Sequence, residues 1–271
     1  RSLIALALLT GNIGQPGTGI HPLRGQNNVQ GASDAGLIPM VYPDYQPVTD
    51  KNVQQKFETT WDTPLNPKLG LTVTEILQAA EKKEVTGLYV MGENPAMSDP
   101  DLNHARHSLA QLQHLVVQDI FFTETASFAD VILPASAFPE KTGTFTNTDR
   151  RVQLGRAAVA TPGDARQDIE IIQELANRIG LDWDDCTPES VFSEMTRTMQ
   201  SISGITWAQL EQRDSITYPY TLDNPESETV LFKENFDLIG GYAKFSPAHF
   251  SHAAELPDEE FPLVLITGRQ L

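Results

Sequence analysis

The clearest pattern in the chain lies between residues 72 and 134, where short apolar runs alternate with longer amphipathic stretches. The apolar runs GLYVMG, HLVVQD and VILP, at residues 87–92, 114–119 and 131–134, predict three buried strands. Helices joined to strands by short links predict parallel strands, so we expect an α/β chain with a Rossmann-like sheet and flanking helices. In such sheets, ligands bind beyond the carboxyl ends of the strands.

Capping residues predict where the helices begin. Thr72 and Glu75 have the spacing of a capping box and predict a helix over 72–81. Asp99 and Pro100 suit the start of a helix that continues to about residue 113. Further helices are predicted at 2–10 (buried), 123–130 (short), 167–179, from 187 onward and at 207–212.

The other stretches predict irregular structure, with one exception at the end of the chain. Residues 42–67 are rich in proline and polar side chains, and residues 139–153 form a polar stretch with two adjacent arginines, so we expect loops in both. The run PLVLITG, at 262–268, instead predicts a buried strand.

An unusual polar motif, HPLRGQNNVQGASDAG, occupies residues 21–36. One arginine, Arg24, precedes the carboxamides of Gln26, Asn27 and Asn28, with a glycine on either side of the carboxamide group. Glycine and asparagine favour neither helix nor strand. Each carboxamide can both donate and accept hydrogen bonds, and arginine offers a planar cationic fork. The motif therefore indicates a surface for a planar polar group with an anion close by.

Composition narrows the possible functions. With 271 residues and 40% hydrophobic residues, the chain can form one large or two ordinary domains. Its formal net charge of -17 argues against nonspecific binding to nucleic acid or an anionic membrane surface. No apolar run approaches the roughly 20 residues that span a bilayer, so we expect no direct membrane insertion. A cytoplasmic location is the default expectation for a chain with one cysteine and no internal disulfide. The single cysteine, Cys186, cannot hold an iron–sulfur cluster by itself.

Four stretches occur in the order found in one enzyme family. They are LLTGNIGQPGTGIHPLRGQNNVQGASDAG, LYVMGENPAMSDPD, VVQDIFFTETASFADVILPASAFPEKTGTFTNTDRRVQ and ITGRQL. Together they resemble the catalytic subunit of molybdenum- or tungsten-dependent formate dehydrogenases, which are molybdopterin oxidoreductases with two molybdopterin guanine dinucleotides. The first residue is Arg1 and the last strand runs into a turn, so we expect an internal fragment of a multidomain protein.

The resemblance implies four parts. Residues 1–26 would end a preceding α/β domain and carry an active-site loop, and 27–140 would form the Rossmann-like, dinucleotide-binding domain. Residues 141–236 would form a helical segment that packs toward an iron–sulfur domain. Residues 237–271 would begin a C-terminal β-barrel domain.

The resemblance also gives the motif a role. Arg24 would be the catalytic residue that holds the formate carboxylate with a bidentate fork, and Gly25, Gln26 and Asn27 would contact the pterin. The alternative is that Arg24 only ties down a loop. Nitrate reductases resemble the family here but usually lack an arginine at this place, which favours formate.

Further cofactor contacts are carried over from the family at five places. The residues are Gly92, Glu93 and Asn94 after the first strand, Gln118 and Asp119 after the second, Thr123 and Thr125, Asp130, and finally Thr267, Gly268 and Arg269. The first group would meet a diphosphate, although a simple turn after a strand is the alternative. Asp130 would accept hydrogen bonds from guanine or, equally, only end a helix.

The expected cofactors are a bis-molybdopterin guanine dinucleotide with molybdenum or tungsten, and a [4Fe-4S] cluster in a preceding part of the protein. No metal ligand is expected within this chain. The expected partners are formate and an iron–sulfur or flavin electron-transfer subunit. Two alternatives stay open: a nitrate reductase-like molybdopterin enzyme, or a non-catalytic, cofactor-free scaffold relative in an electron-transfer complex.

Overall fold

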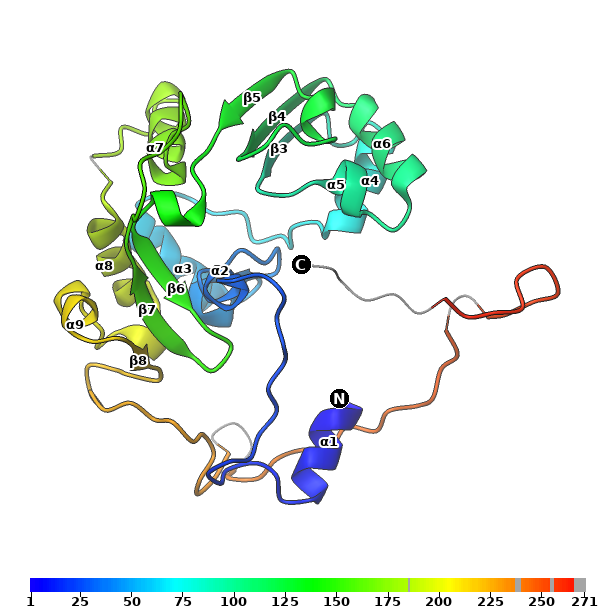
Figure 1. Ribbon diagram of the computed structural model, residues 1–271. Helices are drawn as coiled ribbons and strands as arrows, with labels where there is room; N and C mark the ends of the chain where they lie inside the picture. The colour runs from blue at the N-terminus through cyan, green and yellow to red at the C-terminus, as the bar shows by residue number, and fades with distance from the viewer. Residues whose placement is uncertain (185, 237–239, 254–255, 266–271) are drawn as a thin grey trace.

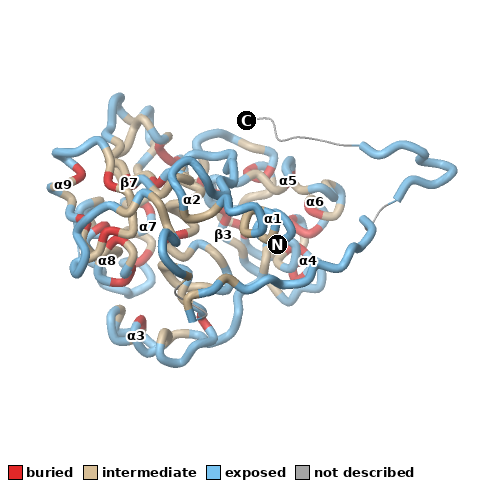
Figure 2. The backbone as a smooth tube through the Cα atoms, turned by 90° about the horizontal axis from the view of Figure 1, so that it is seen from below, coloured by how far each residue is buried: buried red, intermediate tan, exposed pale blue. Residues whose placement is uncertain are grey.

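The computed structural model of the chain describes residues 1–184, 186–236, 240–253 and 256–265 (Figure 1). Two units with a sheet each lie side by side, one with parallel and one with antiparallel strands. The helix α1 (Ser2–Leu9) and the C-terminal segment beyond Thr229 extend away from both units. Figure 2 shows that buried residues concentrate in the two units, whereas α1 and the tail are exposed or only partly buried.

The parallel unit confirms the pattern predicted for residues 72–134. Its strands β3 (Gly87–Met91), β4 (His114–Asp119) and β5 (Val131–Pro134) pair in that order and are all parallel. Helix α4 (Val73–Glu81) precedes β3, the helices α5 (Pro95–Ser98) and α6 (Leu102–Ala110) connect β3 to β4, and the short 3-10 helix η2 (Ala126–Phe128) precedes β5. The α/β class is therefore confirmed.

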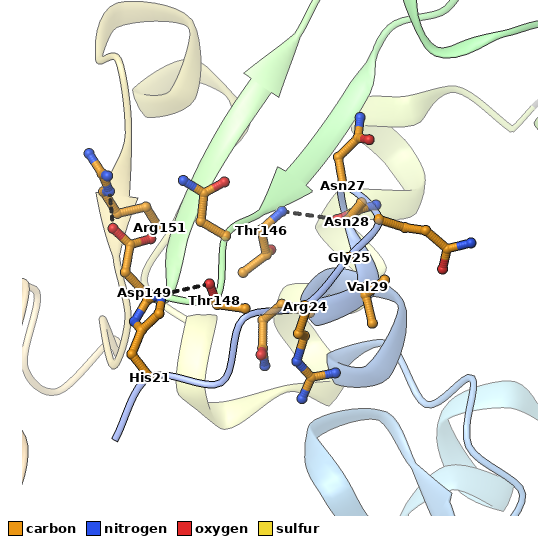
Figure 3. A pocket seen from close by; sticks show the side chains of 13 residues that line it. His21, Arg24, Gly25, Asn27, Asn28, Val29, Thr146, Thr148, Asp149 and Arg151 are labelled. Carbon is orange, nitrogen blue, oxygen red and sulfur yellow. Dashed lines mark hydrogen bonds and ion pairs between the residues drawn. The ribbon is translucent and has the colours of Figure 1, made fainter. Parts of the chain in front are cut away.

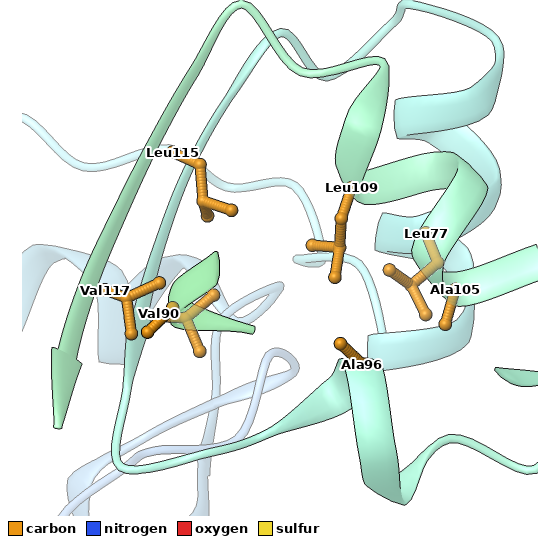
Figure 4. Packing of buried hydrophobic residues seen from close by; sticks show 8 residues of the cluster. Leu77, Val90, Ala96, Ala105, Leu109, Leu115 and Val117 are labelled. Atoms are coloured by element: carbon orange, nitrogen blue, oxygen red, sulfur yellow. The ribbon is translucent and has the colours of Figure 1, made fainter. Parts of the chain in front are cut away.

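The core of the parallel unit forms where the helices pack on the sheet (Figure 4). Leu115 and Val117 of β4 point to the same face of the sheet, because side chains alternate along a strand, and both are fully buried. Leu77 of α4 and Leu109 of α6 pack against them. The contact therefore joins two helices to the central strand.

Helix boundaries in this unit follow the capping side chains. The backbone N–H of Thr72 donates to Glu75 Oε2 at 2.7 Å, which confirms that the predicted capping box begins α4. The helix predicted from Asp99 instead begins at Leu102, because the Asp101 side chain accepts from His104 N at 3.1 Å. A capping carboxylate two residues further on thus decides where α6 starts.

The antiparallel unit contains strands β6 (Gly143–Thr146), β7 (Arg151–Gly155) and β8 (Ile216–Thr217), in the order β6-β7-β8. The helices α7 (Asp168–Arg178), α8 (Pro188–Thr198) and α9 (Trp207–Gln212) lie beside this sheet. The prediction of a loop at 139–153 was wrong, since most of this stretch is a hairpin. Val152 supplies the buried side chain, and it packs in a cluster with Phe192 and Leu210.

Short elements join the motif to the antiparallel unit. They are α2 (Val29–Asp34), the two-residue strands β1 (Val41–Tyr42) and β2 (Gln46–Pro47), the 3-10 turn η1 (Pro43–Tyr45) and the helix α3 (Lys51–Trp61). The 3-10 turns η3 (Phe138–Glu140) and η4 (Gln200–Ile202) complete the elements. A bridge between Ala135 and Arg166 connects the end of β5 to the segment before α7.

Three expectations fail for physical reasons. Residues 42–67 contain α3, whose Phe57 is fully buried between Tyr42 and Trp61, with ring centroids 4.7 Å away from each. None of the residues of α1 is buried, although its sequence is almost wholly apolar. The described part of the predicted terminal strand, 262–265, has no strand structure, and Leu263 is 86% exposed. Apolar sequence predicts burial only where another element covers it.

The domain boundaries and the C-terminal barrel stay predictions. Among the described residues, no helix is long and apolar enough to cross a membrane.

Shortening a core side chain tests the packing of the parallel unit. Leu109 is 2% exposed, so Leu109→Ala leaves a cavity and lowers the free energy of unfolding by about 2–5 kcal/mol. Leu222→Ala is the control, because Leu222 is 76% exposed, and it changes that free energy by less than about 0.5 kcal/mol. Urea denaturation of both variants measures the difference, and equal stabilities would contradict the assigned core.

Removing a cap tests why α3 forms. The Asp50 carboxylate accepts from Asn52 N at 2.8 Å and Val53 N at 3.3 Å. Asp50→Ala leaves both N–H groups without this acceptor and lowers the free energy of unfolding by about 1 kcal/mol. The neighbouring Lys51→Ala, at an exposed helical position, serves as the control in the same denaturation experiment. A cap that contributes nothing would give the two variants the same midpoint.

Candidate functional site

The polar motif lines a hollow of about 540 Å³ between the loop before α2 and the tip of the β6–β7 hairpin (Figure 3). From the loop come His21 and residues 24–30, and from the hairpin come residues 146–149 and Arg151. Residues 21–27 are all exposed. The structure thus places the predicted Arg24, Gly25, Gln26 and Asn27 together on one wall.

Asn28 has a structural role that separates it from the other two carboxamides. It precedes α2 in the left-handed conformation, with φ of 65°. Its Oδ1 accepts from the backbone N–H of Thr146 at 2.9 Å, and its Nδ2 donates to the Thr144 carbonyl at 3.5 Å (Figure 3). Both partners are backbone groups of β6, so the side chain fastens the motif to the hairpin. Gln26 and Asn27 remain exposed and line the hollow.

Gly31 is required by this contact. A Cβ built on Gly31 would lie 2.1 Å from Asn28 Oδ1, well inside the distance at which two atoms repel. Any side chain at this position would therefore push the carboxamide of Asn28 away from β6.

Arg24 carries an exposed guanidinium. Its Nη1 donates to the Ser33 hydroxyl on α2 at 3.1 Å. Among the described residues, no carboxylate lies within 4.0 Å of its nitrogens. In Figure 3, the Arg24 side chain runs beside α2, whereas Asn27 points to the other side of the loop. Within the part of the chain that the structure describes, Ser33 is the one acceptor of a hydrogen bond from this guanidinium, which has five donors.

The hairpin tip adds polar groups that the sequence analysis did not single out as site residues. His21 Nε2 and Thr148 Oγ1 are 2.9 Å apart, which links the loop to the tip. Arg151 Nε donates to Asp149 Oδ2 at 2.6 Å, while Asp149 Oδ1 is buried without a donor among the described residues. The alternating Thr-Phe-Thr before Asn-Thr-Asp was the available signal for a hairpin that presents these groups.

The two adjacent arginines point to different places. Arg150, with φ of 66°, donates to the carbonyls of Glu228 and Thr229 at 3.1 Å each, and also to the carbonyl of Tyr218. Its burial lowers the pKa of the guanidinium from its usual value. Arg150 therefore holds backbone, and Arg151 is the arginine that lines the hollow.

A second group of predicted residues lies at the carboxyl ends of the parallel strands. Asn94 Oδ1 accepts from the backbone N–H and the hydroxyl of Thr125, at 3.0 and 2.7 Å. Asn94 Nδ2 donates to Glu124 at 2.8 Å, and this hydrogen bond is the main cause that lowers the pKa of the Glu124 carboxyl. The loops after β3 and β4 are thereby joined at the edge where a ligand is expected.

The backbone at this edge is open. Gly92 has φ of 64°, and a Cβ built on it would meet nothing within 4 Å. Glu93 is exposed beside it. The side chain of Asp119 bonds to the main chain that follows it, since its Oδ1 accepts from Ile120 N at 2.7 Å. The hydroxyl of Thr123 likewise accepts from Ala126 N at 3.2 Å. A ligand could thus approach the main chain of Gly92 closely.

Gln118 is engaged inside the protein. Its side chain is fully buried, accepts from the Tyr89 hydroxyl and donates to Asp168 Oδ1 at 2.6 Å. Asp168 also pairs with Lys141. Because both polar atoms of the amide have protein partners, the side chain joins the two units, and its contact with a cofactor stays a prediction.

Asp130 lies away from the other candidates. It precedes β5, and its Oδ2 accepts from the backbone N–H of Leu115 at 2.7 Å, at the amino end of β4. Gly92, Asn94 and Asp119 lie at the carboxyl ends, on the opposite edge of the sheet. The structure therefore does not bring Asp130 together with them. Thr267, Gly268 and Arg269 lie outside the described residues.

Comparison with known proteins gives relatives over the whole chain. The alpha subunit of an F420-dependent formate dehydrogenase from Methanocaldococcus jannaschii is 46% identical over an alignment of 271 positions, which covers 99% of this chain and 40% of the relative. The alpha subunit of F420-dependent formate dehydrogenase 2 from Methanococcus maripaludis is 43% identical, again over 99% of this chain and 40% of the relative. The chain thus spans about two fifths of the length of these relatives.

A solved structure and a family model complete the comparison. Acetylene hydratase from Pelobacter acetylenicus aligns with 54% of this chain and 20% of its own, at 21% identity and with a TM-score of 0.46, which is too low to carry an argument. The family model "Molybdopterin oxidoreductase" matches residues 1–178, about two thirds of the chain and all residues that line the hollow. The chain therefore belongs to the molybdopterin oxidoreductase family.

Proposed function

We propose that this chain is part of the catalytic subunit of a formate dehydrogenase, which oxidises formate to carbon dioxide. The observation that carries the proposal is the exposed guanidinium of Arg24 beside a hollow lined by carboxamides. Relatives named as alpha subunits of formate dehydrogenases, with 43–46% identity, support the same substrate.

The residues present fit a molybdopterin cofactor. The hollow of about 540 Å³ is within the size range of small-molecule sites. Its wall offers the carboxamides of Gln26 and Asn27, and the buried Asp149 Oδ1 is an acceptor without a donor, which suits the N–H groups of a pterin. These residues would hold a pterin, and the open backbone at Gly92, with Glu93 and Asn94, would meet the diphosphate of a guanine dinucleotide.

Arg24 would orient the substrate. Two parallel N–H donors of a guanidinium match the two oxygens of a carboxylate, so the fork fixes both the position and the rotation of formate. Formate then loses one proton and two electrons and leaves as carbon dioxide. The metal of the cofactor, molybdenum or tungsten, would supply the acceptor for these two electrons. Arg24 contributes by aligning the C–H bond before the reaction.

We also propose where the electrons go and where in the cell the enzyme is located. A [4Fe-4S] cluster in another part of the protein would accept the electrons, and an iron–sulfur or flavin subunit would receive them next. We also propose a cytoplasmic location, since the single cysteine gives the chain no internal disulfide.

Metal analysis separates the enzyme from its alternatives. We expect about one molybdenum or tungsten atom per chain in the native full-length protein, measured by elemental analysis, because both metals use the same pterin ligands. A folded native protein with neither metal would contradict the proposal and favour a cofactor-free scaffold. A loaded protein that oxidises no formate but reduces nitrate would favour a nitrate reductase-like enzyme.

Substitution of the arginine tests its role. Arg24→Ala in the full-length protein lowers kcat/KM for formate by at least about 100-fold, because the carboxylate loses its orienting partner. Arg24→Lys recovers only a small part, since lysine lacks the fork.

Two controls belong to this experiment. The metal and pterin contents of both variants stay normal, which separates substrate binding from cofactor loading. Arg197→Ala removes another exposed arginine, on α8, and keeps the activity of the unmodified protein. Unchanged turnover in Arg24→Ala would rule out the assigned role.

A further inference from the structure

A buried carboxylate lies behind the motif loop. Asp34, the last residue of α2, is 6% exposed. Its Oδ1 accepts from Gln30 Nε2 at 2.7 Å, and its Oδ2 accepts from the Tyr218 hydroxyl at 2.7 Å. Gln30 Nε2 also lies 3.2 Å from the hydroxyl of Tyr45. Among the described residues, Asp34 forms no ion pair. The hydrogen bonds from these neutral donors therefore offset the free energy that burying the carboxylate requires.

The hydroxyl of Tyr218 is a reliable donor. Burial is the main cause that raises its pKa far above the usual value, and its hydrogen bond to Asp34 adds to this. The hydroxyl therefore keeps its proton. The pKa of Tyr45 is also raised, mainly by burial and then by Asp34, while Arg24 lowers it. Tyr45 thus lies within the electrostatic reach of both the carboxylate and the guanidinium.

Tyr218 is fixed by the hairpin as well. Its backbone N–H donates to the Arg150 carbonyl at 3.0 Å, and the guanidinium of Arg150 donates back to the Tyr218 carbonyl. Arg150 belongs to the tip of the β6–β7 hairpin, which forms the second wall of the hollow. One residue therefore connects α2 to the wall that faces the motif.

Helix α2 in turn holds Arg24. Ser33, next to Asp34, accepts from Arg24 Nη1 at 3.1 Å. A rotation or shift of α2 would move Ser33 and, with it, the contact that orients the guanidinium. An apolar contact would hold the helix in place without fixing its rotation, whereas hydrogen bonds to both carboxylate oxygens fix both.

We propose that Asp34, Gln30 and Tyr218 are positioning residues that set the orientation of Arg24 through α2 and Ser33. This inference rests on the proposed function of Arg24. Neither Asp34 nor Tyr218 lines the hollow, so they act on the substrate only through the arginine.

Two variants of the full-length protein test the inference. Tyr218→Phe removes one donor to Asp34, and Ser33→Ala removes the contact to Arg24 without touching the buried network. Both raise the KM for formate by roughly tenfold with a smaller change in kcat, because a misplaced guanidinium binds the carboxylate less well. Metal and pterin contents stay normal. If both variants keep the KM and kcat of the unmodified protein, the inference is wrong.

Tyr220→Phe is the matched control. Tyr220 is also buried, only two residues from Tyr218, but its hydroxyl accepts from Gln209 of α9 at 3.3 Å. This variant lowers the thermal midpoint to an extent similar to Tyr218→Phe and leaves the KM for formate unchanged. A KM that rises equally in both tyrosine variants would show a general loss of stability and would overturn the inference.

A double-mutant cycle tests whether the effect passes through the arginine. In the Arg24→Lys background, Tyr218→Phe changes kcat/KM by less than about twofold, because the fork that the network orients is already gone. A full tenfold effect in that background would mean that Tyr218 acts by another route, and would exclude positioning of Arg24.

Hydrogen exchange distinguishes a failure of this inference from a failure of the proposed function. Backbone amides of residues 24–34 exchange faster in Tyr218→Phe than in Tyr220→Phe, measured by mass spectrometry without substrate. Normal turnover in Arg24→Ala would refute the function of the arginine while this difference persisted. Equal exchange in the two tyrosine variants, with Arg24→Ala inactive, would refute the positioning role alone.

Discussion

The hydrogen bond between the Asn28 side chain and the backbone of β6 is the contact on which the arrangement of the site depends. At 2.9 Å from the Thr146 N–H, the carboxamide takes the place of a neighbouring strand along that edge. The contact closes a loop of more than a hundred residues, whose ordering costs entropy, so a short-range contact alone would not fix the motif. With it, the exposed polar groups of residues 24–27 come to lie opposite the hairpin tip.

The motif therefore divides its polar side chains between support and function. Asn28 binds backbone, Gln30 binds the buried Asp34, and Arg24, Gln26 and Asn27 remain exposed. The same division occurs in the hairpin, where Arg150 binds three carbonyls and its neighbour Arg151 lines the hollow. Supporting residues use their donors within the protein, whereas the exposed ones have donors that a ligand would be able to reach.

Sequence patterns predicted the structure well where local and long-range preferences agree. The strands ending at Met91, Asp119 and Pro134 follow from apolar runs bounded by turns, and their parallel pairing is confirmed. The hairpin was missed because its polar threonines are stabilised by pairing, and α3 was missed because flanking prolines suggested a loop. Asp130 was carried over from the family, whereas its place directly before the parallel strand β5 puts it at the amino edge of the sheet, away from the carboxyl ends.

The attachment at Thr146 also separates the position of the motif loop from the distance that the hairpin tip extends over the hollow. Asn28 binds the last residue of β6, so this attachment of the motif loop does not depend on the length of the turn at 147–150. The length of that turn sets how far the hairpin tip extends over the hollow. Relatives with longer or shorter turns could therefore change the size of the molecule admitted while keeping the same exposed arginine, and substrate range could diverge within the family without rebuilding the fold.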